Sequence, residues 1–132
     1  MNCSSEPIQT KPVYRERLQQ ALRVMQGVVE RHEEDRFDIN TFARDSEGGV
    51  ICCIAGFCGL DPWFQERGLV TKVGNHFGDV SILPEEFFGT DKPFYAPKYG
   101  KPSNLVTIDD GIAALNRAID EMSDTPEASG QA

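Results

Sequence analysis

Residues 48–60 read GGVICCIAGFCGL, a stretch with three cysteines and no charged side chain. Its apolar character indicates that it is buried in the folded protein, but two secondary structures fit it. The β-branched residues of its first half favour a strand, whereas a continuous run of apolar and small residues suits a buried helix. We predict a helix, because Ala55, Gly56 and Gly59 would let another element pack closely against it.

Two longer amphipathic helices are predicted, one on each side of this segment. From Pro12 to about Arg31, apolar residues recur at spacings of three and four, which places them on one stripe of a helix. Near the other end, Thr107 and Asp110 have the spacing of a capping box, and a second apolar stripe follows as far as Met122. The predicted fold class is therefore mainly α: a small single domain in which long N-terminal and C-terminal amphipathic helices surround a buried central helix.

Three shorter elements are predicted in the middle of the chain. Asp61 and Pro62 are typical of the residues that begin a helix. Residues 69–73 and 79–83 contain alternating β-branched side chains and flank a glycine-rich turn, which allows a short β-hairpin. Residues 84–89, PEEFFG, indicate one helical turn that stops at a glycine.

One globular domain is expected over residues 13–122, with disordered tails at 1–12 and 123–132. The chain has 132 residues, and its ends are polar and contain proline and serine. No apolar run approaches the ~20 residues that a membrane-spanning helix needs, and the N-terminus lacks the apolar stretch of a signal peptide. We therefore expect a cytoplasmic protein whose cysteines are reduced.

The chain is acidic, with 21 Asp and Glu against 13 Lys and Arg and a formal net charge of −8 at pH 7. This balance opposes generic binding to nucleic acid or to an anionic membrane, because such binding depends mainly on cations that neutralise phosphates. It is compatible with a basic protein partner, with mimicry of a nucleic acid, or simply with solubility.

The central cysteines allow three interpretations. A zinc site needs four ligands in paired spacings, and no histidine is close in sequence to Cys52, Cys53 and Cys58, so we predict no metal site. A nucleophilic cysteine needs a base, for which His76 on its glycine-flanked turn is the attractive candidate, although the spacing selects no single cysteine. Because buried cysteine behaves as a small hydrophobic residue, we expect core packing, with no catalytic residue and no cofactor.

Residues 36–60, RFDINTFARDSEGGVICCIAGFCGL, are similar to a pattern in small uncharacterised proteins of bacteria and their phages. In that group a phrase like Phe-Asp-Met-x-x-Trp leads into Cys-Gly-Thr-x-x-Cys-x-Ala-Gly-Trp, which residues 37–39 and 53–57 resemble. Gly48 and Val50 stand where the pattern has its first cysteine and its threonine, so no paired-cysteine site is implied. The resemblance implies opening and closing helices and a phage or mobile-element origin, and it carries no activity.

We expect a small accessory protein that is not an enzyme and that binds another macromolecule, for example a phage or mobile-element protein that antagonises a basic host factor. Two sets of side chains are the expected contacts: the acidic residues at and after the end of the first helix and the exposed aromatic residues of a proline-rich loop. The acidic set could equally be a solvated surface. These residues are Glu30, Glu33, Glu34, Asp35 and Asp38, together with Phe94, Tyr95 and Tyr99.

The alternative is a cysteine-dependent hydrolase or transferase that uses Cys52, Cys53 or Cys58 with His76. A small-molecule sensor also stays open, because a pocket cannot be seen in a sequence. Direct binding to nucleic acid or to a membrane is not expected from the acidic balance.

Overall fold

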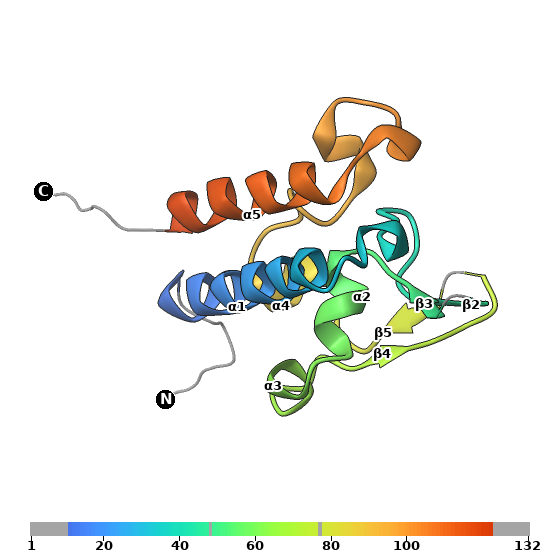
Figure 1. Cartoon of the computed structure of the whole chain (residues 1–132). Helices are drawn as coiled ribbons and strands as arrows, with labels where there is room; N and C mark the ends of the chain where they lie inside the picture. The colour runs from blue at the N-terminus through green and yellow to red at the C-terminus, as the bar shows by residue number, and fades with distance from the viewer. Residues whose placement is uncertain (1–10, 48, 77, 123–132) are drawn as a thin grey trace, which may run out of the picture.

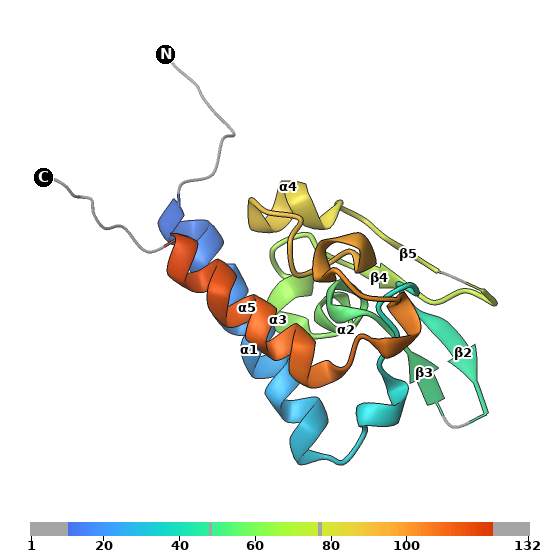
Figure 2. The same ribbon diagram turned by 90° about the horizontal axis from the view of Figure 1, so that it is seen from above.

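The computed structural model describes residues 11–47, 49–76 and 78–122. Two long helices lie on one side of the molecule, and the short helices and strands lie beside them (Figure 1, Figure 2). The elements, in chain order, are α1 (Lys11–Glu30), η1 (Glu34–Arg36), β2 (Arg44–Ser46), β3 (Gly49–Ile51), α2 (Ile54–Gly59), α3 (Pro62–Gln65), β4 (Thr71–Lys72), β5 (Asp79–Val80), α4 (Pro84–Phe88), η2 (Ala96–Tyr99), η3 (Ser103–Leu105) and α5 (Ile108–Met122), where η marks a 3-10 helix.

Helices α1 and α5 run in opposite directions and lie side by side in both views (Figure 1, Figure 2). Both were predicted from their apolar periodicity, and both are confirmed. Their stripes meet in the core, where Leu18 and Leu115 are fully buried, and each such side chain contributes roughly 1.5–3 kcal/mol. Apart from the first two residues of α1, the tails expected at 1–12 and 123–132 lie outside the described residues.

Helix α1 ends in a Schellman turn that reverses the chain. The N–H of Glu33 donates to the carbonyl of Val28, and the N–H of His32 donates to the carbonyl of Val29, both at 3.0 Å. His32 takes the left-handed position of this turn, with a φ of 58°, where glycine is the usual residue. Because the chain turns back here, η1 lies close to the end of α1.

The segment around the cysteines is divided between a strand and a short helix. β3 pairs antiparallel with β2, and α2 begins only at Ile54 and has six residues. The expected fold class, a mainly α domain around one buried central helix, is therefore wrong. Within the described residues, helical residues outnumber strand residues, 54% against 12%, but only two helices there reach seven residues, and two small antiparallel sheets are present. The β-branched residues Val50 and Ile51 extend because a partner strand satisfies their backbone groups, and the small residues after them form the helix.

Small residues in α2 allow the close packing that the sequence predicts. A Cβ atom at Gly56 would lie 1.5 Å from the carbonyl oxygen of Phe42. A Cβ atom at Gly59 would lie 1.9 Å from Oγ1 of Thr71, whose hydroxyl donates to the carbonyl of Gly56 at 2.8 Å. The loop before β2 and strand β4 therefore lie directly on the backbone of α2.

The two sheets are joined into one nearly continuous layer. β4 pairs with β5 as the predicted hairpin, and Gly74, just after β4, lies against β2. The N–H of Gly74 donates to the carbonyl of Ala43 at 3.0 Å, and its carbonyl accepts from the N–H of Asp45 at 3.1 Å. A parallel bridge between Phe37 and Cys52 extends the layer beyond β3.

The short helices begin and end as their sequences indicate. Asp61 caps α3, because its carboxylate accepts from the N–H of Trp63 at 3.1 Å. Gly89 ends α4 with a φ of 75°. Thr107 and Asp110 form the reciprocal capping box before α5, with bonds of 2.9 and 3.2 Å between each backbone N–H and the other side chain.

Candidate functional site

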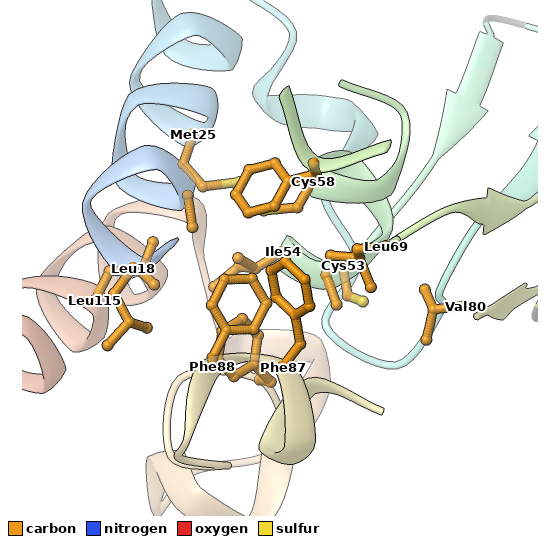
Figure 3. Close-up of a cluster of buried hydrophobic side chains, with 14 of the residues drawn as sticks. Leu18, Met25, Cys53, Ile54, Cys58, Leu69, Val80, Phe87, Phe88 and Leu115 are labelled. Atoms are coloured by element: carbon orange, nitrogen blue, oxygen red, sulfur yellow. The ribbon is translucent and has the colours of Figure 1, made fainter. Parts of the chain in front are cut away.

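The three central cysteines lie inside the core. Cys52 and Cys58 have no exposed surface and Cys53 is 2% exposed, and Figure 3 shows Cys53 and Cys58 among apolar side chains. Burial raises the pKa of Cys52 to about 12 and that of Cys53 to about 11, and it raises the pKa of Cys58 well above the usual value. Because the thiolate is the reactive form of cysteine, reactive sulfur is scarce here at neutral pH.

The histidine proposed as a catalytic base lies elsewhere. His76 is exposed and belongs to the connection between β4 and β5, which extends away from α2 in both views (Figure 1, Figure 2). The labelled side chains around Cys53 and Cys58 in Figure 3 are apolar. Within the described residues the structure does not bring a thiol and an imidazole together, as cysteine catalysis by such a pair requires.

A small cavity of about 180 Å³ lies beside Cys53. It brings this cysteine together with two of the predicted contact residues, Phe94 and Tyr95, and it is bounded on the other side by Thr41 and Phe42. Its lining has no histidine, carboxylate or lysine. The cavity therefore supplies apolar volume beside a neutral thiol and no acid–base pair.

The aromatic side chains of the proline-rich loop hold the loop in place. Phe94 is 2% exposed and stacks on Phe88 with ring centroids 4.5 Å apart, so the expectation that it is exposed is wrong. The hydroxyl of Tyr95 donates to Glu85 at 2.7 Å, and that of Tyr99 donates to a carbonyl of its own loop. Burial, and then the carboxylate of Glu85, raises the pKa of Tyr95, and burial raises that of Tyr99. Phe94 is therefore closed to a partner, whereas Tyr95 and Tyr99 are half-buried.

The predicted acidic contact residues divide into two groups. Glu33 pairs with Arg31 at 3.0 Å, and Asp38 accepts from the N–H of Asn40 at 3.0 Å and from the hydroxyl of Thr41 at 3.2 Å. The other three side chains are exposed and make no hydrogen bond or ion pair with the part of the chain that the structure describes. We call these three the acidic corner: Glu30, Glu34 and Asp35.

A hollow of about 370 Å³ opens beside the acidic corner. The residues that line it include Asp35, Asp38, Asn40, Arg44 and Ser103. We call it the acidic hollow. No group of three or more His, Cys, Asp or Glu in residues 11–47, 49–76 and 78–122 could hold a metal ion. The acceptor groups of the hollow are suited instead to a hydrogen-bond donor, such as a lysine or arginine side chain.

A second hollow, of about 460 Å³, is lined from the opposite face of η1. Arg23, Arg31 and Arg36 line it together with apolar side chains, and we call it the arginine hollow. Sequence reasoning missed it. The spacing of Arg23 and Arg31 on one helix was a readable signal, but only the turn at His32 brings Arg36 to them.

Comparison with known proteins identifies no relative: no family model matches the chain, and neither a curated protein nor a solved structure matches it significantly. In the described part of the chain, no helix is both long enough and apolar enough to cross a bilayer. The function must therefore be argued from the two hollows and the surface around them.

Proposed function

We propose that this protein is a non-enzymatic accessory protein that binds a basic macromolecule through the acidic corner and the acidic hollow. One observation carries the proposal: Glu30, Glu34 and Asp35 are exposed without partners in the described residues, next to a hollow that Asp35 also lines. Unpaired carboxylates attract a basic surface through solvent and speed its association.

The residues that line the acidic hollow could bind a basic side chain directly. The carboxylates of Asp35 and Asp38 and the amide of Asn40 present oxygen acceptors to one space. A lysine or arginine side chain that enters it would exchange its hydration for charge-assisted hydrogen bonds. Arg44 also lines the hollow, but two carboxylates outnumber this single guanidinium group, so the lining still favours a cation.

A cysteine-dependent hydrolase or transferase is the competing proposal. It needs a thiolate beside a base, whereas Cys52, Cys53 and Cys58 are buried with raised pKa values and His76 is exposed on another segment. Binding is therefore better supported than catalysis. The resemblance of residues 36–60 to small bacterial and phage proteins suggests a host nucleic-acid-binding protein as the basic partner.

Charge reversal at the acidic corner tests the proposal. The triple variant Glu30→Lys, Glu34→Lys and Asp35→Lys is compared as bait with the wild type in a bacterial lysate, and bound proteins are quantified by mass spectrometry. A matched control reverses three exposed carboxylates elsewhere, Glu16, Glu86 and Asp120, and changes the net charge equally. We expect the corner variant to lose specific partners at least about tenfold, while the control keeps them within about twofold.

Salt provides the second readout. A partner that is held by exposed charges should be released when the ionic strength rises from about 0.05 to 0.5 M, because screening shortens the range of the attraction. Retention of the same partners by the corner variant, or an equal loss in the control, would show that the acidic corner is only a solvated surface.

A further inference from the structure

The arginine hollow is built mainly on one face of α1 and its end. Arg23, Gly27 and Arg31 follow one another at spacings of four, so they lie along one line of the helix surface. The N–H of Arg31 still donates to the carbonyl of Gly27 at 3.0 Å, which keeps this line regular past the last residue of α1. Arg36 arrives from η1 after the turn at His32 and completes a wall of three guanidinium groups.

Two glycines make room for two of these guanidinium groups. A Cβ atom at Gly49 would lie 1.6 Å from Nη1 of Arg36, so the guanidinium occupies the space that any other side chain would need. A Cβ atom at Gly27 would lie 3.1 Å from Nη1 of Arg31. The guanidinium groups of Arg36 and Arg31 therefore lie against the backbone at Gly49 and Gly27.

The charges around the hollow do not balance. Of its two carboxylates, Glu33 is paired with Arg31, and Asp61 accepts from the first turn of α3. Arg23 donates to a neighbouring glutamine, which is neutral, at 3.0 Å. Arg36 makes no side-chain hydrogen bond or ion pair within the described residues. The three arginines and two carboxylates of the lining leave one net positive charge in a protein whose net charge is −8, and Arg23 and Arg36 are the two cations without a carboxylate partner.

The rest of the lining is apolar. Val24 of α1, Phe57 of α2 and Leu60 after it contribute to the wall, and Leu60 is 40% exposed. The volume of about 460 Å³ lies within the range of roughly 300–1,000 Å³ that is usual for small-molecule sites. The hollow thus combines an apolar surface with one net positive charge and with two arginines that have no carboxylate partner.

From this arrangement we propose that the arginine hollow binds a phosphate monoester carried on a flat apolar group, the chemistry of phenyl phosphate or of a nucleoside monophosphate. Guanidinium groups pair with phosphate oxygens through two parallel hydrogen bonds, and a monoester carries about −1.5 to −2 charges at pH 7. The phosphate would pair with Arg23 and Arg36, the two arginines of the lining that have no carboxylate partner, and the apolar group would pack on Phe57 and Leu60. This site goes beyond the proposed function, because it concerns a small anion on the opposite face of η1.

Calorimetric titration with phenyl phosphate tests the site on the full-length protein. Arg36→Gln should weaken binding at least about tenfold, because it removes a hydrogen bond between two charged groups. Arg44→Gln is the matched control: it removes the same charge from the acidic hollow and should change the affinity less than about twofold. Arg23→Gln, at an exposed position of α1, is a second test variant if Arg36→Gln fails to fold.

Two further ligands separate the parts of the site. Benzoate has the ring but a single charge, and inorganic phosphate has the charge but no ring, so each should bind at least about tenfold more weakly than phenyl phosphate. Leu60→Ser should weaken phenyl phosphate and leave inorganic phosphate unchanged.

Three results would overturn the inference: no heat of binding with millimolar phenyl phosphate, equal affinity of Arg36→Gln and the wild type, or equal losses in Arg36→Gln and Arg44→Gln. The last would mean that phenyl phosphate responds only to the net charge. Each of these outcomes leaves the acidic corner and its basic partner untouched, so the two proposals fail separately.

Discussion

The acidic hollow and the arginine hollow lie on either side of one short 3-10 helix, yet they use charge differently. In the acidic hollow, Asp38 also holds its own loop, whereas Asp35 makes no hydrogen bond or ion pair within the described residues. In the arginine hollow, three arginines outnumber two carboxylates, and Arg23 and Arg36 have no carboxylate partner. One region presents spare negative charge and the other presents spare positive charge.

The difference shows how local geometry sorts charges that are mixed in the sequence. Residues 33–38 read EEDRFD, with one cation among carboxylates. Glu33 and Arg36 line one hollow, and Asp35 and Asp38 line the other, because the chain leaves η1 after Arg36 and is extended at Phe37. The net charge of such a segment says little about what either face presents.

The largest loss of stability is expected from a substitution in helix α2, and it should disturb both hollows. Gly56→Ala should lower the free energy of unfolding by at least about 3 kcal/mol, because the new methyl group would overlap the carbonyl of Phe42. Urea denaturation measures the loss. Phe57 of α2 lines the arginine hollow, and Ile51, which precedes α2, lines the acidic hollow. A displacement of α2 from Phe42 should therefore disturb both hollows.

Gly27→Ala is the matched control for this substitution. Its methyl group would meet only the flexible end of Arg31, and a glycine within a helix is about 0.5–1 kcal/mol less favourable than alanine. A slight stabilisation is therefore expected. If Gly56→Ala changes the free energy of unfolding as little as Gly27→Ala does, α2 does not pack closely on the backbone of Phe42.

An intermediate effect is expected from the buried cysteines of the core: a loss of stability at alkaline pH to which the two hollows contribute little. Unfolded thiols ionise near a pKa of 9.0, whereas burial raises the pKa of Cys52 to about 12 and that of Cys53 to about 11. The folded state keeps protons that the unfolded state releases. Stability is then fully present below pH 9 and falls as the pH rises toward 11, by up to about 1.4 kcal/mol per unit for each thiol.

Urea titrations at pH 8, 9 and 10 measure this slope. Carboxylates and guanidinium groups do not titrate in this range, so the hollows should contribute little to it. Cys52→Ala should make the slope shallower, since one of the three described thiols is gone. A free energy of unfolding that stays flat to pH 10 would contradict the buried, protonated cysteines.

The smallest effect would sharpen the division within the acidic hollow. Asp38→Ala should lower the free energy of unfolding by about 1–2 kcal/mol, because the N–H of Asn40 and the hydroxyl of Thr41 lose their acceptor. Asp35→Ala should change it by less than about 0.5 kcal/mol, since this side chain is exposed and unpaired in the described residues. Thermal melts of the two variants, measured side by side, are sufficient. Equal losses would mean that Asp35 is also structural.

Patterns that depend on near neighbours could be predicted from the sequence. The apolar stripes of α1 and α5, the capping box at Thr107 and the glycine stop at Gly89 all lie within a few residues of what they determine. The start of the central helix could not, because Val50 and Ile51 become a strand only when β2 lies beside them. The pairing of β3 with β2 is a tertiary contact, which the local sequence does not show.

The candidate sites follow the same division. Burial of the cysteines followed from an uncharged apolar run, and it is confirmed. The arginine hollow was missed because Arg36 lies on the same hollow as Arg23 only after the chain reverses at His32. The sequence has no glycine at this position that would indicate a left-handed turn. Phe94 was expected to be an exposed contact residue, but it is buried and stacks on Phe88 of α4, a contact between segments that the local sequence does not show.

The junction at Gly74 has a consequence for how the molecule comes apart. One peptide unit on each side of this residue joins the β4–β5 hairpin to β2, through two hydrogen bonds. If these two bonds open, the hairpin loses β2 but stays on α2, where the hydroxyl of Thr71 donates to the carbonyl of Gly56. Local opening at Gly74 would therefore separate the two sheets while the hairpin and the long helix pair stay packed.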